Sequence, residues 1–158
     1  MAKEIERKFL VFQGISFLKK LAGDSIEQGY LHDKGMTSRV RIVNNTAGVL
    51  TLKGPRRGIT RDEFEYAIPL EDARELMNYC GSHKLSKTRY EVPVAGHIWH
   101  VDIYYGALQG LVTAEIELSA ESESFVKPTW VGTEVTEDKS YSNKNLARAA
   151  RVPLKQVA

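Results

Sequence analysis

Carboxylate and cationic side chains recur at every second position in several segments of the sequence. Three acidic pairs and two basic pairs share this spacing: Glu4/Glu6, Glu63/Glu65, Glu115/Glu117, Arg39/Arg41 and Lys87/Arg89. Carboxylates are hard oxygen ligands that suit Mg²⁺ or Mn²⁺. Arg binds phosphate oxygens through two parallel hydrogen bonds, whereas Lys binds them as a point charge. Together these residue types predict a site for a divalent metal and a polyphosphate.

The elements that carry these residues are predicted to be β-strands. Residues i, i+2 and i+4 of a strand face the same side. Charged and apolar residues alternate here, so that Glu4, Glu6 and Lys8 oppose Ile5 and Phe9. The charged face collects the cations Lys8, Arg39, Arg41, Lys53, Arg61, Lys87 and Arg89, and the anions Glu4, Glu6, Glu63, Glu65, Glu91, Asp102, Glu115 and Glu117.

A solvated sheet face is the alternative interpretation of this alternation. Antiparallel sheets commonly expose one charged side, where cross-strand ion pairs contribute only a few tenths of a kcal/mol each. Two features favour a ligand site instead. The positions on the charged face are mostly ionisable rather than Ser, Thr, Asn or Gln, and like charges are paired, which costs energy unless a ligand compensates.

Eight segments have the composition and spacing of strands, and short turns between several of them favour antiparallel pairing. The segments are 3–11, 25–32, 38–44, 48–53, 60–68, 84–93, 98–105 and 111–119. Three helices are also predicted. The first follows Ser16 as N-cap and ends near Gly23, the second begins after Pro69 and ends near Gly81, and the third spans about 142–151.

Length and composition favour a single domain over residues 1–158, of the α+β class and mainly β. If the eight strands close into an antiparallel barrel, the charged face lines its interior and the apolar face lies outward beneath a few flanking helices.

The net charge is only +2, so no nucleic-acid partner is expected. The sequence has no long apolar run, which argues against a membrane segment. The single cysteine, Cys80, favours a cytoplasmic location.

The order of the motifs resembles the CYTH family, also called the triphosphate tunnel metalloenzymes, and is closest to its short bacterial inorganic triphosphatases. Glu4-x-Glu6-x-Lys8 matches the family's N-terminal motif. The matching segments downstream are Gln28-Gly29-Tyr30-Leu31, Arg39-x-Arg41, Leu52-Lys53-Gly54, Glu63-Phe64-Glu65, Lys87-x-Arg89-Tyr90, Val101-Asp102 and Glu115-Ile116-Glu117-Leu118. The resemblance implies an eight-stranded antiparallel tunnel that binds a linear triphosphate.

The resemblance also implies roles for individual residues. The residues expected to bind substrate are Lys8, Arg39, Arg41, Lys53, Lys87 and Arg89, with Tyr30 at the tunnel mouth. Those expected to bind metal are Glu115 and Glu117 with Glu4, Glu6 and Asp102. Those expected to be catalytic are Glu4, Glu6 and Lys87. Glu63 and Glu65 are tunnel acids that either orient other groups or contact the metal. Simple strand packing is the alternative for Tyr30. For Lys144 a solvated surface position is favoured over an approach to the tunnel from the C-terminal helix.

The function expected from this resemblance is hydrolysis of inorganic tripolyphosphate, or another triphosphate such as a nucleoside triphosphate, to diphosphate and phosphate with Mg²⁺ or Mn²⁺. Two alternatives remain open. Class IV adenylate cyclases share the motif and convert ATP to cyclic AMP, although no purine pocket can be recognised in the sequence. A non-catalytic polyphosphate-binding barrel is the other alternative, but it would not need the acidic pairs. The chain is expected to be a monomer or a homodimer.

Overall fold

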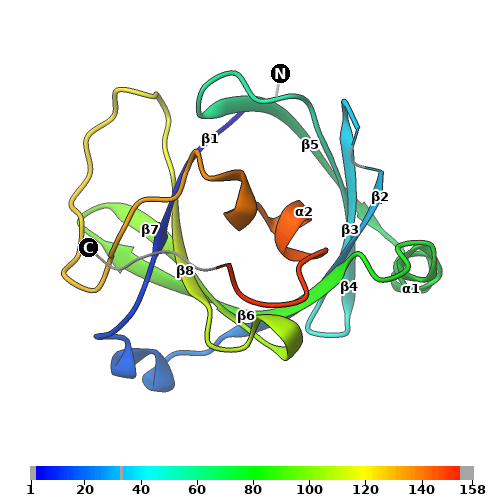
Figure 1. Cartoon of the computed structure of the whole chain (residues 1–158), viewed down its shortest axis with the longest axis horizontal. Coiled ribbons are helices and arrows are strands. Elements are labelled where there is room, and N and C mark those ends of the chain that lie inside the picture. Colours follow the sequence, from blue (N-terminus) through cyan, green and yellow to red (C-terminus); the bar gives the residue numbers. More distant parts are fainter. Residues whose placement is uncertain (1–2, 33, 154–158) are drawn as a thin grey trace.

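Eight antiparallel strands close into a barrel in the computed structural model, which describes residues 3–32 and 34–153 (Figure 1). Around the barrel the strands follow the order β1-β5-β4-β3-β2-β6-β7-β8. This confirms the predicted fold. Their bounds are β1 (Lys3–Leu10), β2 (Asp24–His32), β3 (Thr37–Val43), β4 (Ala47–Lys53), β5 (Thr60–Ile68), β6 (Lys84–Val94), β7 (His97–Tyr104) and β8 (Val112–Glu117).

Strand β1 closes the barrel by pairing with two different neighbours. Its first residues, Lys3 to Ile5, pair with β5, and the residues from Glu6 to Leu10 pair with β8. In this register Glu6 lies opposite Glu117 and Lys8 lies opposite Glu115. The closure therefore brings the acidic residues at the two ends of the strand order onto neighbouring strands.

The outward faces of the strands are largely apolar and are covered in two places. Trp99 and Ile116 belong to a buried cluster over β1, β6, β7 and β8. Helix α1 (Leu70–Asn78) packs over β2, β3 and β4. The helix and the residues just after it come so near that a Cβ at Gly29 would lie 2.9 Å from the Met77 sulfur and 2.6 Å from the Cys80 sulfur, which explains the glycine in the middle of β2.

The predicted helices occur, but two of them are shorter than expected. The first is a 3₁₀ helix, η1 (Ser16–Lys20), in which only Leu18 is buried. The predicted Ser16 N-cap is wrong, because Ile15 occupies that position and no side chain caps the helix. A single apolar anchor holds one turn of helix but cannot extend it to Gly23. Helix α1 ends as predicted, with Gly81 in the left-handed region at φ 57°.

The C-terminal part of the described chain folds into two short helices rather than one long helix. These are η3 (Lys139–Tyr141) and α2 (Asn143–Leu146), and a further 3₁₀ helix, η2 (Gly106–Leu108), was not predicted. Ser142 caps α2 as expected, with its hydroxyl accepting from the Asn145 backbone N–H at 3.4 Å. From the Arg148 N–H onward the backbone hydrogen bonds join residues three apart instead of four, which tightens the last turn and ends the helix.

One end of the barrel interior is apolar and is filled by this C-terminal segment. Figure 1 shows α2 inside the ring of strands. Leu146 and Tyr141 pack there against inward-facing residues of the strands, including Leu10, Leu85 and Tyr104. The charged interior predicted from alternation thus occupies only part of the barrel, and the C-terminal segment forms its boundary.

No helix among the residues that the structure describes is long and apolar enough to cross a membrane.

Candidate active site

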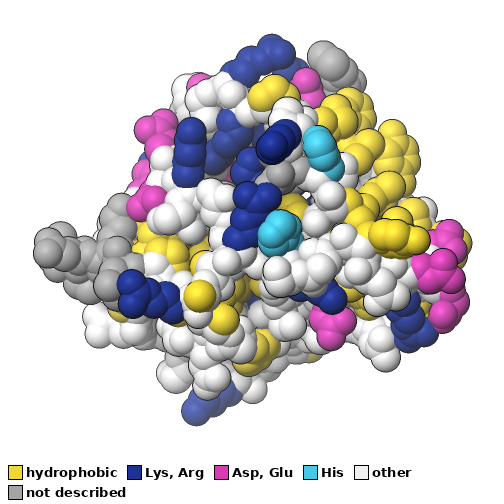
Figure 2. All heavy atoms as spheres, turned by 45° about the vertical axis from the view of Figure 1, so that its right-hand side comes forward, with side chains coloured by type: hydrophobic (Ala, Val, Ile, Leu, Met, Phe, Trp, Pro, Cys, Tyr) yellow, Lys and Arg dark blue, Asp and Glu magenta, His cyan; other side chains and the backbone are white. Residues whose placement is uncertain are grey.

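The rest of the interior is a cavity of about 720 Å³. All of the residues predicted for the site line this cavity, except Lys87 and Asp102. The strands direct alternate side chains into it, while η3, α2 and the loops before them form part of its wall. Figure 2 shows Lys and Arg side chains gathered around a hollow in the upper part of the molecular surface that it draws. The sequence pattern therefore predicted most of the residues that line the cavity.

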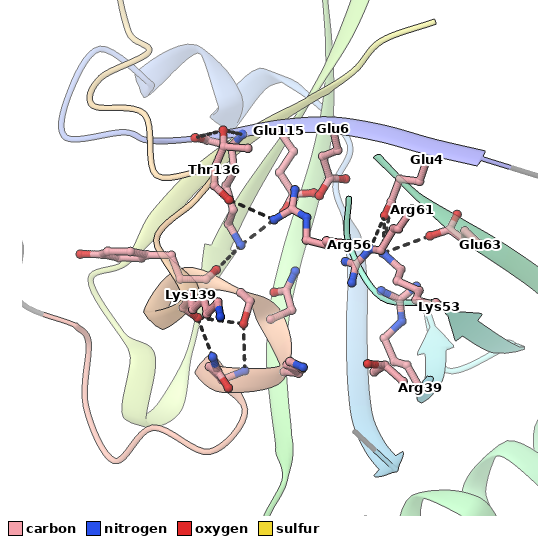
Figure 3. Close-up of a pocket in the computed structure, with 18 of the residues that line it drawn as sticks. Glu4, Glu6, Arg39, Lys53, Arg56, Arg61, Glu63, Glu115, Thr136 and Lys139 are labelled. Atoms are coloured by element: carbon pink, nitrogen blue, oxygen red, sulfur yellow. Dashed lines mark hydrogen bonds and ion pairs between the residues drawn. The ribbon is translucent and has the colours of Figure 1, made fainter. Parts of the chain in front are cut away.

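Glu6 and Glu115 form the acidic centre of the cavity (Figure 3), directed into the same space from neighbouring strands. Burial, together with the charges of Glu115 and Glu4, raises the pKa of Glu6 to about 8. Burial would also raise the pKa of Glu115, but Lys8 and Arg89 hold it well below its usual range. The Glu115 Oε1 atom is buried with no hydrogen-bond partner, and Lys8 Nζ lies 3.5 Å away. Two cations, Lys8 and Arg89, lie near Glu115, but its Oε1 atom accepts no hydrogen bond from the described residues and remains available to a ligand.

Glu4 is in a different situation, because two cations hold both of its oxygens. Lys53 Nζ donates to Oε1 at 2.8 Å and to Oε2 at 3.1 Å, and Arg61 Nε donates to Oε2 at 3.0 Å. Burial opposes ionisation, but these two cations lower the pKa of Glu4 to about 2. Lys53 also pairs with Glu63 at 3.0 Å. The sequence spacing groups Glu4 with Glu6 on one strand. In the structure, Glu6 interacts instead with Glu115 on the neighbouring strand.

Arg39 and Arg41 extend from β3 into the cavity, and each has guanidinium N–H groups that are not used in hydrogen bonds within the described part of the protein. One Arg39 nitrogen, Nη2, donates to the Thr51 hydroxyl at 3.0 Å, but its buried Nε has no hydrogen-bond partner. Arg41 donates to the Gln28 side chain. Burial, together with the neighbouring charges of Arg39 and Arg89, lowers the pKa of Arg41 to about 9. A bound anion would relieve both effects.

Lys87 and Asp102 form a buried ionic cluster behind the cavity wall, and Arg89 joins it from the cavity side. Lys87 Nζ donates to Asp102 Oδ2 at 2.7 Å, and Arg89 donates to both Asp102 oxygens at 2.8 Å. The side chains of Lys87 and Asp102 are fully buried. Burial would raise the pKa of Asp102, but Arg89 and Lys87 lower it strongly. In this conformation only Arg89 reaches the cavity, so the roles predicted for Lys87 and Asp102 remain predictions.

The C-terminal segment contributes groups that sequence reasoning missed. The Tyr141 carbonyl oxygen accepts from Lys8 Nζ at 2.7 Å, and the Thr136 carbonyl oxygen accepts from Arg56 at 3.0 Å. These positions belong to loops and short helices, where no strand alternation marks an inward-facing residue. Lys144, for which a solvated surface position is favoured by the sequence over an approach to the tunnel, lies in the cavity wall.

Comparison with known proteins agrees with this geometry. A model of the CYTH domain matches residues 2–151, and the chain belongs to the CYTH domain family. It is 44% identical over 150 residues to an inorganic triphosphatase of Acetivibrio thermocellus, covering 94% of this chain and 95% of that protein. An inorganic triphosphatase of Nitrosomonas europaea is 35% identical over 149 residues, covering 91% and 96%.

The fold is similar to a solved structure as well. A crystal structure of an inorganic triphosphatase superimposes with a TM-score of 0.68 at 33% sequence identity, covering 94% of this chain and 97% of that chain. The relatives and the chain are therefore matched over nearly their whole lengths.

Membership of this family implies a divalent metal, and the side chains can be tested against that requirement. No group of three or more His, Cys, Asp or Glu in the described residues is arranged as a preformed metal site. Mg²⁺, however, is usually bound by one or two carboxylates, with water and substrate phosphates as the other ligands. Glu6 and Glu115, with an unpartnered buried oxygen between β1 and β8, supply that donor set. The residues fit the metal.

Proposed function

We propose that this protein is a metal-dependent triphosphatase that hydrolyses inorganic tripolyphosphate to diphosphate and phosphate. One observation supports the proposal above the others: the same cavity holds a buried cationic donor without an acceptor, at Arg39, and a buried carboxylate oxygen without a donor, at Glu115. A metal–polyphosphate complex carries charges of both signs and would satisfy both groups.

The cationic wall would bind the phosphate chain. Arg39 and Arg41 have unused guanidinium donors directed into the cavity, and Arg bonded to two phosphate oxygens fixes position as well as charge. Lys8 and Lys53 would add point charges along the chain of phosphates. Glu4 holds Lys53 and Arg61 in place, and the Lys87–Asp102 pair fixes Arg89 in the same way.

Glu6 and Glu115 would hold the divalent ion, which we propose to be Mg²⁺ or Mn²⁺, with Glu117 near the same end of β8. When bound, this ion would offset phosphate charge and polarise the group that is attacked. In hydrolysis, water attacks a terminal phosphorus, the bond to the bridging oxygen breaks, and diphosphate leaves. The chain's own contribution is to hold the phosphates in line and to stabilise the charge on the leaving oxygen, so no covalent intermediate is needed.

The matched relatives support this substrate class, because both are inorganic triphosphatases. We further propose a cytoplasmic location, which agrees with a single, buried, unpaired Cys80.

Product analysis with tripolyphosphate and ATP side by side would test the proposal. The expected result is phosphate release from tripolyphosphate in Mg²⁺ or Mn²⁺ and none in excess chelator. Cyclic AMP from ATP would instead support the cyclase alternative. Tight binding of tripolyphosphate without turnover, at any metal concentration, would support the non-catalytic barrel.

A further inference from the structure

Arg41 differs from the other cations that the strands direct into the barrel interior. Each of the others lies near a carboxylate, from 2.7 Å at Lys87 to 3.8 Å at Arg39. Within residues 3–32 and 34–153, Arg41 forms no such ion pair. Arg41 is partly buried, and removing a cation from water without a counter-ion is unfavourable, so its partner in the folded protein needs an explanation.

The partner is the neutral side chain of Gln28, which is fully buried on β2 directly across from Arg41. The Gln28 amide oxygen accepts from Arg41 Nε at 3.0 Å and from Nη2 at 2.8 Å. A guanidinium group has donors and no acceptors, so the amide oxygen and not the amide nitrogen must face it. The orientation of Gln28 is therefore determined by Arg41.

This orientation determines the next hydrogen bond. The Gln28 amide nitrogen points the other way and donates to the Tyr30 hydroxyl oxygen at 3.1 Å. Because that oxygen accepts, the hydroxyl hydrogen of Tyr30 remains available for another acceptor. Tyr30 and Arg41 both line the cavity. One amide thus leaves two neighbouring side chains as hydrogen-bond donors toward an anion.

We propose that Gln28 is a positioning residue that holds Arg41 and Tyr30 as phosphate donors without neutralising the Arg41 charge. This inference rests on the proposed function. A carboxylate at position 28 could accept the same two hydrogen bonds from Arg41, but it would form an ion pair and compete with the substrate for that cation. A neutral amide maintains the geometry and leaves the full charge for a phosphate.

Gln28→Glu separates the two requirements, because it keeps the shape and the acceptors while adding a charge. We expect the variant to fold and to resist heat at least as well as the wild type. The dissociation constant for tripolyphosphate, measured by calorimetry, should rise by about ten- to a hundredfold. The turnover number at saturating substrate should change less than the affinity. Gln109→Glu, the same substitution on an exposed loop, should change neither quantity.

A double-mutant cycle tests whether Gln28 acts through Arg41. Gln28→Met removes the acceptor, Arg41→Met removes the cation, and the double variant removes both. If Gln28 acts through Arg41, its substitution should weaken tripolyphosphate binding in the wild type but change little once Arg41 is absent. Should Gln28→Met fail to fold, the Gln28→Glu comparison alone decides the matter.

The outcomes distinguish this inference from the function it rests on. A wild-type protein that binds tripolyphosphate, with a Gln28→Glu variant that binds it equally well, would overturn the role of Gln28 and leave the function intact. Additive effects of Gln28→Met and Arg41→Met would do the same. A wild-type protein that does not bind tripolyphosphate would overturn both.

Discussion

The barrel contains two groups of buried charges that use the same residue types in opposite ways. In the cluster behind the wall, Lys87 and Arg89 donate to both oxygens of Asp102, and no oxygen of that carboxylate is left free. In the cavity, Arg39 has a buried nitrogen and Glu115 a buried oxygen without partners. The first group is complete without a ligand, and the second is not.

This difference shows how burial and hydrogen bonding together separate a structural charge from a binding charge. Buried polar groups are nearly always hydrogen-bonded, and exceptions need an explanation. The cluster behind the wall is expected to govern stability, and the cavity group is expected to govern ligand binding. Substitutions in the two groups should therefore affect different measurements.

The largest effect is expected from Asp102→Ala. This substitution leaves Lys87 and Arg89 as buried cations without their main partner, which should lower the free energy of unfolding by about 3–5 kcal/mol. Urea denaturation measures the change. Asp62→Ala, which removes an exposed partner of Lys3 at 3.8 Å, is the control and should cost less than about 1 kcal/mol. Equal costs for both variants would contradict the division into two groups.

Arg41→Ala should reduce activity strongly and stability little, the reverse of what is expected from Asp102→Ala. It removes charge-assisted hydrogen bonds to phosphate worth about 1.5–3 kcal/mol, so kcat/KM for tripolyphosphate should fall by roughly ten- to 150-fold. The free energy of unfolding should change much less than in Asp102→Ala. Arg41→Lys should recover only part of the activity, because the charge returns without the planar fork. Wild-type kinetics in Arg41→Ala would place this residue outside the binding site.

The acids of the cavity can be ranked by their metal requirement. Glu115→Gln should raise the Mg²⁺ or Mn²⁺ concentration needed for half-maximal activity by roughly tenfold, since one of two buried carboxylates is lost. Glu117→Gln, at the exposed end of β8, should raise it less. Activity against metal concentration measures both shifts. A larger shift in Glu117→Gln than in Glu115→Gln would place the metal nearer to the exposed end of β8.

The smallest effect concerns an exposed ion pair, Arg7 with Glu134. Hydrogen bonds from Arg7 lower the pKa of Glu134 against a small opposing effect of burial. A lowered pKa stabilises the folded state above the unfolded value near 4.5, and this is lost as the pH falls through the folded value. After solvent screening the pair should contribute only about 0.5 kcal/mol.

Wild type and Glu134→Gln should accordingly differ by a constant amount near pH 7, and the difference should shrink below about pH 4.5. Urea denaturation at several pH values checks this. A difference that grows toward acid pH would show that Glu134 is not stabilised as an anion in the folded protein.

Strand alternation predicted the strands and most of the cavity wall, because a period of two is a property of each strand alone, and the family resemblance implied their closure into a barrel. It could not predict which acids meet. That depends on the register between β1 and β8, which brings Glu6 close to Glu115 and leaves Glu4 with Lys53 and Arg61. Register is a relation between distant segments, and sequence spacing does not contain it.

Three further features could not be predicted from the sequence. Asp102 and Lys87 alternate with apolar residues as the other charges do, yet their mutual contact hides both behind the wall. Gln28 belongs to a matching motif but is neutral and was given no role, although its spacing of two from Tyr30 places it on the same face. The Tyr141 carbonyl belongs to the backbone, so no side-chain pattern could mark it.

Thermal unfolding with tripolyphosphate and a divalent ion that supports no turnover would show whether the cavity binds a metal–triphosphate complex. A ligand that binds only the folded state stabilises it by about 2.7 kcal/mol at a hundred times its dissociation constant. We expect a clear rise in the melting temperature of the wild type when both are present, larger than with either alone, and a much smaller rise in Arg41→Ala. No rise at saturating concentrations, or the same rise in Arg41→Ala, would contradict this expectation.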